Sequence, residues 1–284
     1  MGTSRVIRAN EQELYCEMHG EGQPLVLIMG IGYDATLWTL HQVPWFAQRF
    51  KVVIFDNRDI GRSGAATEAY SIADMADDVA GLLDGLAIER AHVLGLSMGA
   101  MIAEELALRH VDRVDRLVLS GPDAAPARHA FHPIEVWSWV RANDDSGEIV
   151  AAQQLSWLFS NAFMRDRTAV RQTLDLLSAN PNPPLAEAYA RQASAYLGHD
   201  PEGRRGGITA PTLVIVGEQD LLTPPWIARE VADAIPGARL EIVAGAGASH
   251  VLPLERPDEF NALVEDFLTA SLPARGTILP TGGS

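Results

Sequence analysis

The chain has 284 residues, enough for one large α/β domain with an insertion or for two small domains. Its formal net charge is −15 at pH 7, and a field of this sign repels phosphate backbones, so nucleic acid is not expected as a partner. Hydrophobic residues make up 47% and charged residues 21%, which is ordinary for a soluble globular protein. No run approaches the ~18 apolar residues of a membrane span, so no membrane partner is expected.

The N-terminal segment and the cysteine content together predict a cytoplasmic protein. No apolar run follows Arg5 and Arg8, so a signal peptide is not expected. Cys16 is the only cysteine and cannot form an internal disulfide. Neither a C-x-x-C nor an H-E-x-x-H pattern occurs, so no metal site is predicted. The sequence gives no indication of the oligomeric state.

Strands and helices are expected to alternate through the first 121 residues. Short edge strands are expected at 5–8 and 13–17, core strands at 24–29, 51–55, 91–94 and 116–120, and helices at 36–50, 71–86 and 98–110. The core runs are continuously apolar, which is typical of strands covered on both faces. This half of the chain therefore predicts a mostly parallel sheet with right-handed crossovers.

Residues 122–207 break this pattern. They contain no β-branched run and instead form amphipathic segments rich in aromatic residues, which predicts a helical insertion. Strands are then expected again at 211–216 and 239–243, and helices at 224–235 and 257–268. The prediction is an α/β fold with a doubly wound core formed by 1–121 and 208–272, and a helical cap formed by 122–207. The tail at 273–284 has linker composition and is predicted to be disordered.

A candidate nucleophile lies in Gly95-Leu96-Ser97-Met98-Gly99, between an expected strand and an expected helix. A serine in such a strand-to-helix turn has a strained backbone, and a Cβ at either glycine would collide with the neighbouring strand or helix. The turn lifts the hydroxyl clear of the sheet, at the positive end of the helix dipole. The pattern therefore predicts Ser97 as a nucleophile.

A serine nucleophile needs a base and a carboxylate that orients the base. His250 is the expected base, because it ends the flexible loop 245–250 just after a strand. Asp220 is the expected carboxylate, because it follows the strand at 211–216, and the order Ser97, Asp220, His250 suits this architecture. Asp123, at the end of the preceding core strand, and Glu218 remain alternatives for the carboxylate.

The tetrahedral intermediate requires amide donors for its oxyanion. The N–H of Met98, directly after the nucleophile, is one expected donor. The loop after the strand at 24–29 is expected to supply the other from the N–H of Ile31, since Gly30 and Gly32 allow a close backbone approach.

Four motifs occur in the order of a known family and together span about residues 12–270: Gly95-Leu96-Ser97-Met98-Gly99, Asp56-Asn57-Arg58-Asp59-Ile60-Gly61-Arg62-Ser63, Gly217-Glu218-Gln219-Asp220 and Ser249-His250. In these motifs the chain resembles the α/β-hydrolases, and it is most similar to the esterase and enol-lactonase branch that includes aclacinomycin methylesterase. The resemblance implies Ser97 as nucleophile, His250 as base and Asp220 as orienting acid. It also implies Ile31 and Met98 as oxyanion donors.

Two positions depart from the pattern of that family. Met29-Gly30 stands where His-Gly is usual, so an imidazole that normally braces the loop is missing. Asp59 stands where glycine is common. The first departure predicts a loop that is braced differently or a more apolar site, and the second is expected to be structural.

The expected function is hydrolysis of a small-molecule carboxylic ester or lactone through an acyl-enzyme, without a cofactor. A cofactor-free perhydrolase or haloperoxidase-like activity and a carbon–carbon hydrolase share the same triad and remain open, as does a ligand-binding sensor with this fold. The serine argues against haloalkane dehalogenases and epoxide hydrolases, which resemble this fold but carry aspartate at the elbow. An apolar substrate pocket is expected to be lined by Met29, Gly30, Trp137, Trp139, Trp157 and Phe163.

Overall fold

The computed structural model describes residues 2–144, 147–201 and 203–271. The predicted disordered tail at 273–284 lies outside these residues. Within the described ranges, no helix is both long and apolar enough to cross a membrane.

One eight-stranded sheet runs through the molecule in the order β1-β2-β4-β3-β5-β6-β7-β8. The strands are β1 (Thr3–Ala9), β2 (Gln12–His19), β3 (Gln23–Ile28), β4 (Phe50–Phe55), β5 (Ala91–Leu96), β6 (Val114–Ser120), β7 (Thr212–Gly217) and β8 (Arg239–Val243). Strand β2 pairs antiparallel with β1 and β4, and all pairs from β4 to β8 are parallel. This confirms the predicted α/β class with a mostly parallel sheet.

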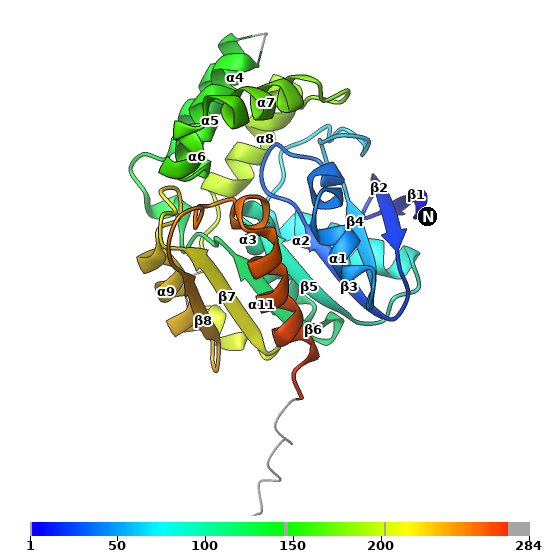
Figure 1. Cartoon of the computed structure of the whole chain (residues 1–284). Helices are drawn as coiled ribbons and strands as arrows, with labels where there is room; N and C mark the ends of the chain where they lie inside the picture. Colours follow the sequence, from blue (N-terminus) through cyan, green and yellow to red (C-terminus); the bar gives the residue numbers. More distant parts are fainter. Residues whose placement is uncertain (1, 145–146, 202, 272–284) are drawn as a thin grey trace, which may run out of the picture.

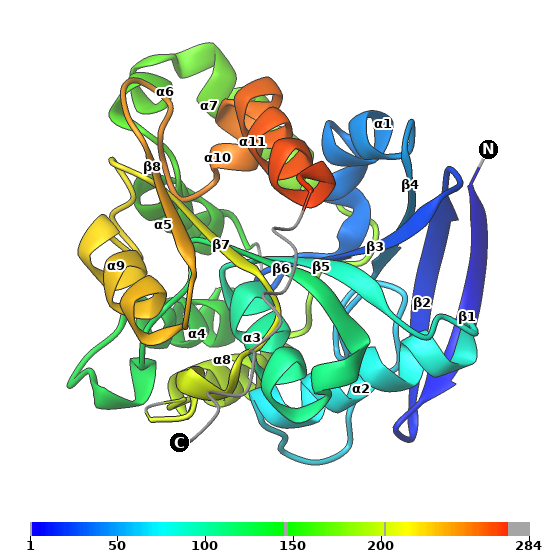
Figure 2. The same cartoon turned by 90° about the horizontal axis from the view of Figure 1, so that it is seen from below.

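The apolar strands bury side chains on both faces of the sheet. In β3, Val26 and Ile28 join one buried cluster with α2 (Ile72–Gly85), α3 (Met98–Arg109) and α9 (Pro225–Ala234). Their neighbours Leu25 and Leu27 join the other cluster, with α1 (Gln42–Phe46) and α11 (Pro257–Thr269). Successive side chains of a strand point to opposite faces, so a continuous apolar run is required here. Figure 2 shows α1 and α11 on one side of the sheet and α2 and α3 on the other.

The segment expected to be one helix at 36–50 is divided. A 3₁₀ helix, η1 (Ala35–Thr39), is followed by the short helix α1. His41 has φ −138° between them and interrupts the helical backbone. Pro44 lies in the first turn of α1. Backbone N–H groups of the first turn have no intrahelical acceptor, so a proline there costs the helix no hydrogen bond.

In the described part of the segment between β6 and β7 there are five α-helices: α4 (Pro133–Asn143), α5 (Glu148–Leu158), α6 (Asn161–Arg165), α7 (Arg167–Ser178) and α8 (Ala186–Leu197). The described residues of 122–207 contain no strand, and we call this segment the cap. Figure 1 shows the cap helices grouped at one end of the sheet. Parallel strands β5, β6 and β7 all end toward this side, so the loops that follow them lie beneath the cap.

Candidate active site

Ser97 occupies a strained turn between β5 and α3. Its φ of 57° and ψ of −122° lie in a region that non-glycine residues rarely adopt, and such strain concentrates at functional sites. A Cβ on Gly95 would lie 2.1 Å from the carbonyl oxygen of Gly99, and one on Gly99 would lie 2.2 Å from the carbonyl oxygen of Ile28. Both glycines are therefore required by close backbone packing around the serine.

His250 and Asp220 form a buried pair. Asp220 follows β7, and its Oδ2 lies 2.8 Å from Nδ1 of His250. A carboxylate only accepts hydrogen bonds, so Nδ1 carries the proton and Nε2 keeps a free lone pair. His250 Nε2 has no hydrogen-bond partner among the described residues, and like Ser97 the histidine lines the cavity described below.

Thr223, which the sequence analysis did not identify, fixes the Asp220 carboxylate. The backbone N–H groups of Leu222 and Thr223 donate to Asp220 Oδ1 at 3.0 and 2.8 Å. The Thr223 hydroxyl donates to Oδ2 at 2.9 Å and also lies 3.2 Å from Nδ1 of His250. With the histidine bond, both carboxylate oxygens are held in place. An aspartate in a loop commonly accepts hydrogen bonds from the backbone N–H groups two or three residues on, which is the sequence signal for the backbone part of this contact.

The two alternative carboxylates have other partners. Asp123 Oδ2 accepts a hydrogen bond from the Tyr196 hydroxyl at 2.9 Å and lies 3.3 Å from Nε2 of His132. Burial alone would raise the pKa of Asp123, but the contacts with His132 and Tyr196 outweigh it and lower the pKa below its usual value. Glu218 Oε1 accepts a hydrogen bond from the backbone N–H of Gly245 at 2.7 Å. Only Asp220, among these three carboxylates, is paired with His250.

The predicted oxyanion donors flank Ser97. Met98 is the first residue of α3, and Ile31 lies in residues 29–33, which we call the oxyanion loop. A Cβ on Gly30 would lie 3.2 Å from the Cβ of Ser97, so this loop packs against the serine. Within the described part of the chain, no acceptor receives a hydrogen bond from the N–H of Ile31 or Met98. Both amides therefore remain candidates for oxyanion donors.

A cavity of about 510 Å³ lies between the core loops and the cap. Ser97 and His250 line it, together with mainly apolar residues from both parts of the chain: Met29, Gly30, Ile31, Trp38, Leu222, Trp137, Leu158, Phe159, Phe163 and Leu177. Phe159 and Phe163 stack with ring centroids 4.1 Å apart. The structure thus brings four of the expected lining residues to the cavity, namely Met29, Gly30, Trp137 and Phe163.

Trp139 and Trp157 do not line this cavity, which corrects the sequence-based expectation. Trp139 is 67% exposed and Trp157 is 40% exposed. Each helical residue advances by about 100°, so Trp139 lies on the face of α4 opposite to buried Trp137. Trp157 lies about 100° around α5 from its neighbour Leu158 and lines a separate surface depression with Phe131.

The polar groups of the cavity wall are neutral or acidic. The Tyr33 hydroxyl donates to Gln154 Oε1 at 2.8 Å, and burial raises the pKa of Tyr33 to about 12, so the phenol stays neutral. Asp166 accepts hydrogen bonds from two amides at the start of α7, and Glu255, in α10 (Leu252–Glu255), accepts from the amide and hydroxyl of Ser160. None of the described lining residues is lysine or arginine. Nor do the described residues contain a group of three histidine, cysteine, aspartate or glutamate side chains placed to hold a metal.

Comparison with known proteins identifies relatives over nearly the whole chain. A family model described as "alpha/beta hydrolase fold" matches residues 23–257. The chain is 31% identical over 266 residues to "Putative carbamate hydrolase RutD" of Caulobacter sp. (strain K31), with 90% of this chain and 96% of the relative covered. The solved enol-lactonase from Burkholderia xenovorans LB400 is 33% identical, with a TM-score of 0.81 over 94% of this chain and 100% of that chain. A thermophilic esterase from Thermogutta terrifontis is 25% identical, with a TM-score of 0.80 over 94% and 98%.

Proposed function

Because this chain belongs to the α/β-hydrolase family, and to its esterase and lactonase branch, we propose that it is a serine hydrolase that cleaves carboxylic esters and lactones through an acyl-enzyme intermediate. One observation carries the proposal. The strained Ser97 and the Asp220-paired His250 line the same apolar cavity, Met98 directly follows Ser97, and the loop that carries Ile31 packs against the serine.

The first half of the reaction acylates the serine. Ser97 Oγ attacks the ester carbonyl while Nε2 of His250 accepts the hydroxyl proton. Asp220 keeps the other ring nitrogen protonated and stabilises the imidazolium that forms. The N–H groups of Ile31 and Met98 donate to the oxyanion, and the leaving alcohol takes the proton from His250. Among the residues that the structure describes, His250 Nε2 has no hydrogen-bond partner; the contact of a base with its nucleophile often tightens only when substrate is bound.

The second half releases the acid. A water molecule gives a proton to His250 Nε2 and attacks the acyl carbon, and the resulting tetrahedral species expels Ser97 Oγ, which regains the proton. In a lactone the leaving alcohol remains attached to the acyl group, so one hydroxy acid is released instead of two products. The solved enol-lactonase at 33% identity supports including cyclic esters among the substrates.

The cavity favours an uncharged acyl group with substantial apolar surface. Burial of such surface contributes roughly 25 cal/mol per Å². The charged lining residues other than histidine are Asp166 and Glu255, so a substrate carboxylate would meet like charge and no cationic partner. The proposed substrates are therefore neutral medium-chain or cyclic esters.

Covalent labelling tests this proposal. A fluorophosphonate should add one phosphonyl group to the protein, located by peptide mass spectrometry at Ser97. Ser97→Ala should fold, remain unlabelled and lose ester hydrolysis by about 10³-fold or more. Ser71→Ala is a matched control, because Ser71 is the exposed N-cap of α2 and lies outside the cavity, so labelling and turnover should persist. Hydrolysis by Ser97→Ala within tenfold of the parent would overturn the assignment.

A further inference from the structure

We infer that Gln192 of cap helix α8 is a positioning residue that holds the oxyanion loop in its working geometry. The inference rests on the proposed function, since it concerns the loop that carries the Ile31 amide. It assigns a reaction-supporting role to a side chain of the cap that does not line the cavity.

The carboxamide of Gln192 joins two core loops through their backbones. Its Oε1 accepts a hydrogen bond from the N–H of Gly32 at 3.0 Å, and its Nε2 donates to the carbonyl oxygen of Arg58 at 3.1 Å. Gln192 is fully buried, so water does not replace either bond. One partner is a donor and the other an acceptor, so only one orientation of the amide satisfies both.

The oxyanion loop is held at both ends. Its first residue, Met29, uses its carbonyl oxygen to accept a hydrogen bond from Nδ2 of Asn57 at 3.1 Å. Gly32, near its other end, is held by Gln192. Gly30 and Ile31 lie between these two anchors, which come from the core and the cap respectively. The direction of the Ile31 N–H therefore depends on where the cap places Gln192.

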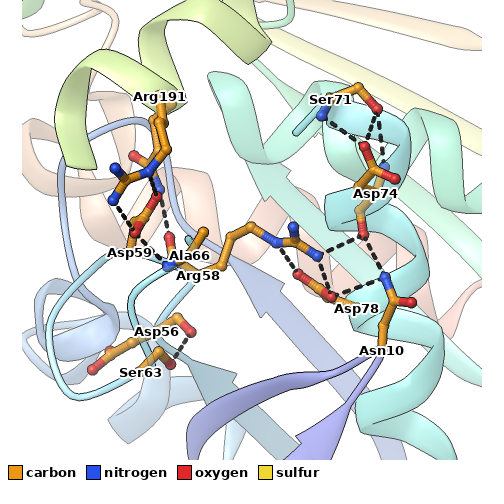
Figure 3. A network of polar contacts seen from close by, with 11 residues as sticks. Asn10, Asp56, Arg58, Asp59, Ser63, Ala66, Ser71, Asp74, Asp78 and Arg191 are labelled. Atoms are coloured by element: carbon orange, nitrogen blue, oxygen red, sulfur yellow. Dashed lines mark hydrogen bonds and ion pairs between the residues drawn. The ribbon is translucent and has the colours of Figure 1, made fainter. Parts of the chain in front are cut away.

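Neighbouring residues of α8 contact the same two loops. Gly32 has φ +77°, and a Cβ there would lie 2.5 Å from Cε2 of Tyr189, so the loop turns directly against α8. Arg191 forms two bonds to the buried Asp59 carboxylate, from Nε to Oδ2 at 2.8 Å and from Nη2 to Oδ1 at 2.7 Å. Figure 3 shows Arg191 reaching down from the cap to Asp59, beside Arg58. Tyr189 and Gln192 thus contact the oxyanion loop itself, whereas the Arg191 pair joins α8 to the loop at 56–63.

The expected kinetic consequence is specific. An amide donor contributes most when it points at the position of the oxyanion, and removing one such donor costs about 10²–10³ in kcat. A loop that keeps its donor but loses one anchor should lose less. Gln192→Met preserves length and burial but makes neither bond, and we expect kcat to fall about 10- to 100-fold with KM within about threefold. Affinity for an alkyl boronic acid, which forms a tetrahedral adduct with a serine, should fall in parallel.

A matched control separates this role from general seating of the cap. Arg191→Met removes the adjacent ion pair, which is partly exposed, and leaves both Gln192 bonds in place; its kcat should stay within about threefold of the parent. The concentration of active protein is measured by titration with the phosphonate, and kcat is calculated per active site. A smaller folded fraction in one variant therefore does not lower its kcat. Equal losses in the two variants, or an unchanged boronic acid affinity in Gln192→Met, would overturn the inference.

Amide hydrogen exchange at Gly32 provides a readout that does not need turnover. The bonded N–H should exchange slowly in the parent and faster in Gln192→Met, with little change in Arg191→Met. An unchanged exchange rate of the Gly32 N–H in Gln192→Met would show that Gln192 does not hold the oxyanion loop. If the parent hydrolysed no ester and took up no phosphonate, the proposed function would fail instead, and the exchange result would still decide whether Gln192 holds the loop.

Discussion

Lengthening the acyl chain of the substrate should increase kcat/KM steeply until the cavity is filled. Each methylene that passes from water to apolar surroundings contributes about 0.8 kcal/mol, or about fourfold at 25 °C. Hexanoate has four methylenes more than acetate, so the upper limit of the gain is roughly 200-fold. The cavity of about 510 Å³ has room for such a chain, and its wall is preformed from buried side chains such as Trp38, Trp137 and Leu158.

The assay compares p-nitrophenyl acetate, butyrate, hexanoate and octanoate at concentrations below KM, with active sites titrated by phosphonate. Ala162→Trp provides a matched variant, because Ala162 lines the cavity from α6 and an indole there would occupy part of it. We expect this variant to flatten the rise toward longer chains. A monotonic decrease in kcat/KM from acetate onward in the parent would show that the acyl group does not enter the apolar cavity.

Three further outcomes are expected. Asp220→Asn should lower kcat by about 10³–10⁴ through the wrong histidine tautomer, whereas Asp123→Asn should lower it less than tenfold; a reversed order in steady-state kinetics would reassign the orienting acid. A p-nitrophenyl half-ester of adipate should react at least tenfold more slowly than the hexanoate ester, because the wall offers its carboxylate no cation; equal rates would contradict that account. Burial lowers the pKa of His92 to about 4, although Asp115 Oδ2 lies 3.3 Å from its Nδ1 and acts in the opposite direction. The unfolded chain therefore takes up this proton first as pH falls below ~6.5, and about 2 kcal/mol of stability should be lost between pH 7 and 5. Urea unfolding of His92→Leu should show a smaller loss over the same interval, and an equal loss would refute the role of His92.

The sheet and the His250–Asp220 pair could be predicted because their signals are local. Strand β3 is buried on both faces, so it is apolar at every core position whatever its neighbours are. The turn at Ser97 requires glycines at fixed offsets, and Asp220 and His250 each follow a strand that ends at the same edge. These requirements can be read from short stretches of sequence.

Contacts between distant segments could not be predicted in the same way. The aromatic content of the cap was evident, but the orientation of α4 and α5 decides that Trp137 faces inward while Trp139 and Trp157 do not. Gln192 is 160 residues away from its partner Gly32, and nothing near either residue indicates the pairing. Polar side chains of this kind acquire their roles only through tertiary packing.

The structure also gives a physical account of the two departures from the family pattern. Met29 supplies no imidazole, but its loop is held by hydrogen bonds from Asn57 and to Gln192. Asp59 adopts φ 70°, which glycine tolerates better, yet its carboxylate binds Arg191 of the cap and the N–H of Ala66. A residue with an unfavourable backbone angle is thus retained together with a contact that glycine could not make.

The Asp59–Arg191 ion pair defines which segments must be transferred together when the cap of one hydrolase is grafted onto another. A graft of residues 122–207 alone, into a host with glycine at the position of Asp59, would bring Arg191 without its carboxylate. Its guanidinium would then lie partly buried and unpaired against the host loop. The transferable unit is therefore discontinuous, consisting of the cap and the loop at 56–63. Chimeras that carry both segments should retain a seated α8, whereas in chimeras that carry only the cap the unpaired charge of Arg191 should displace it.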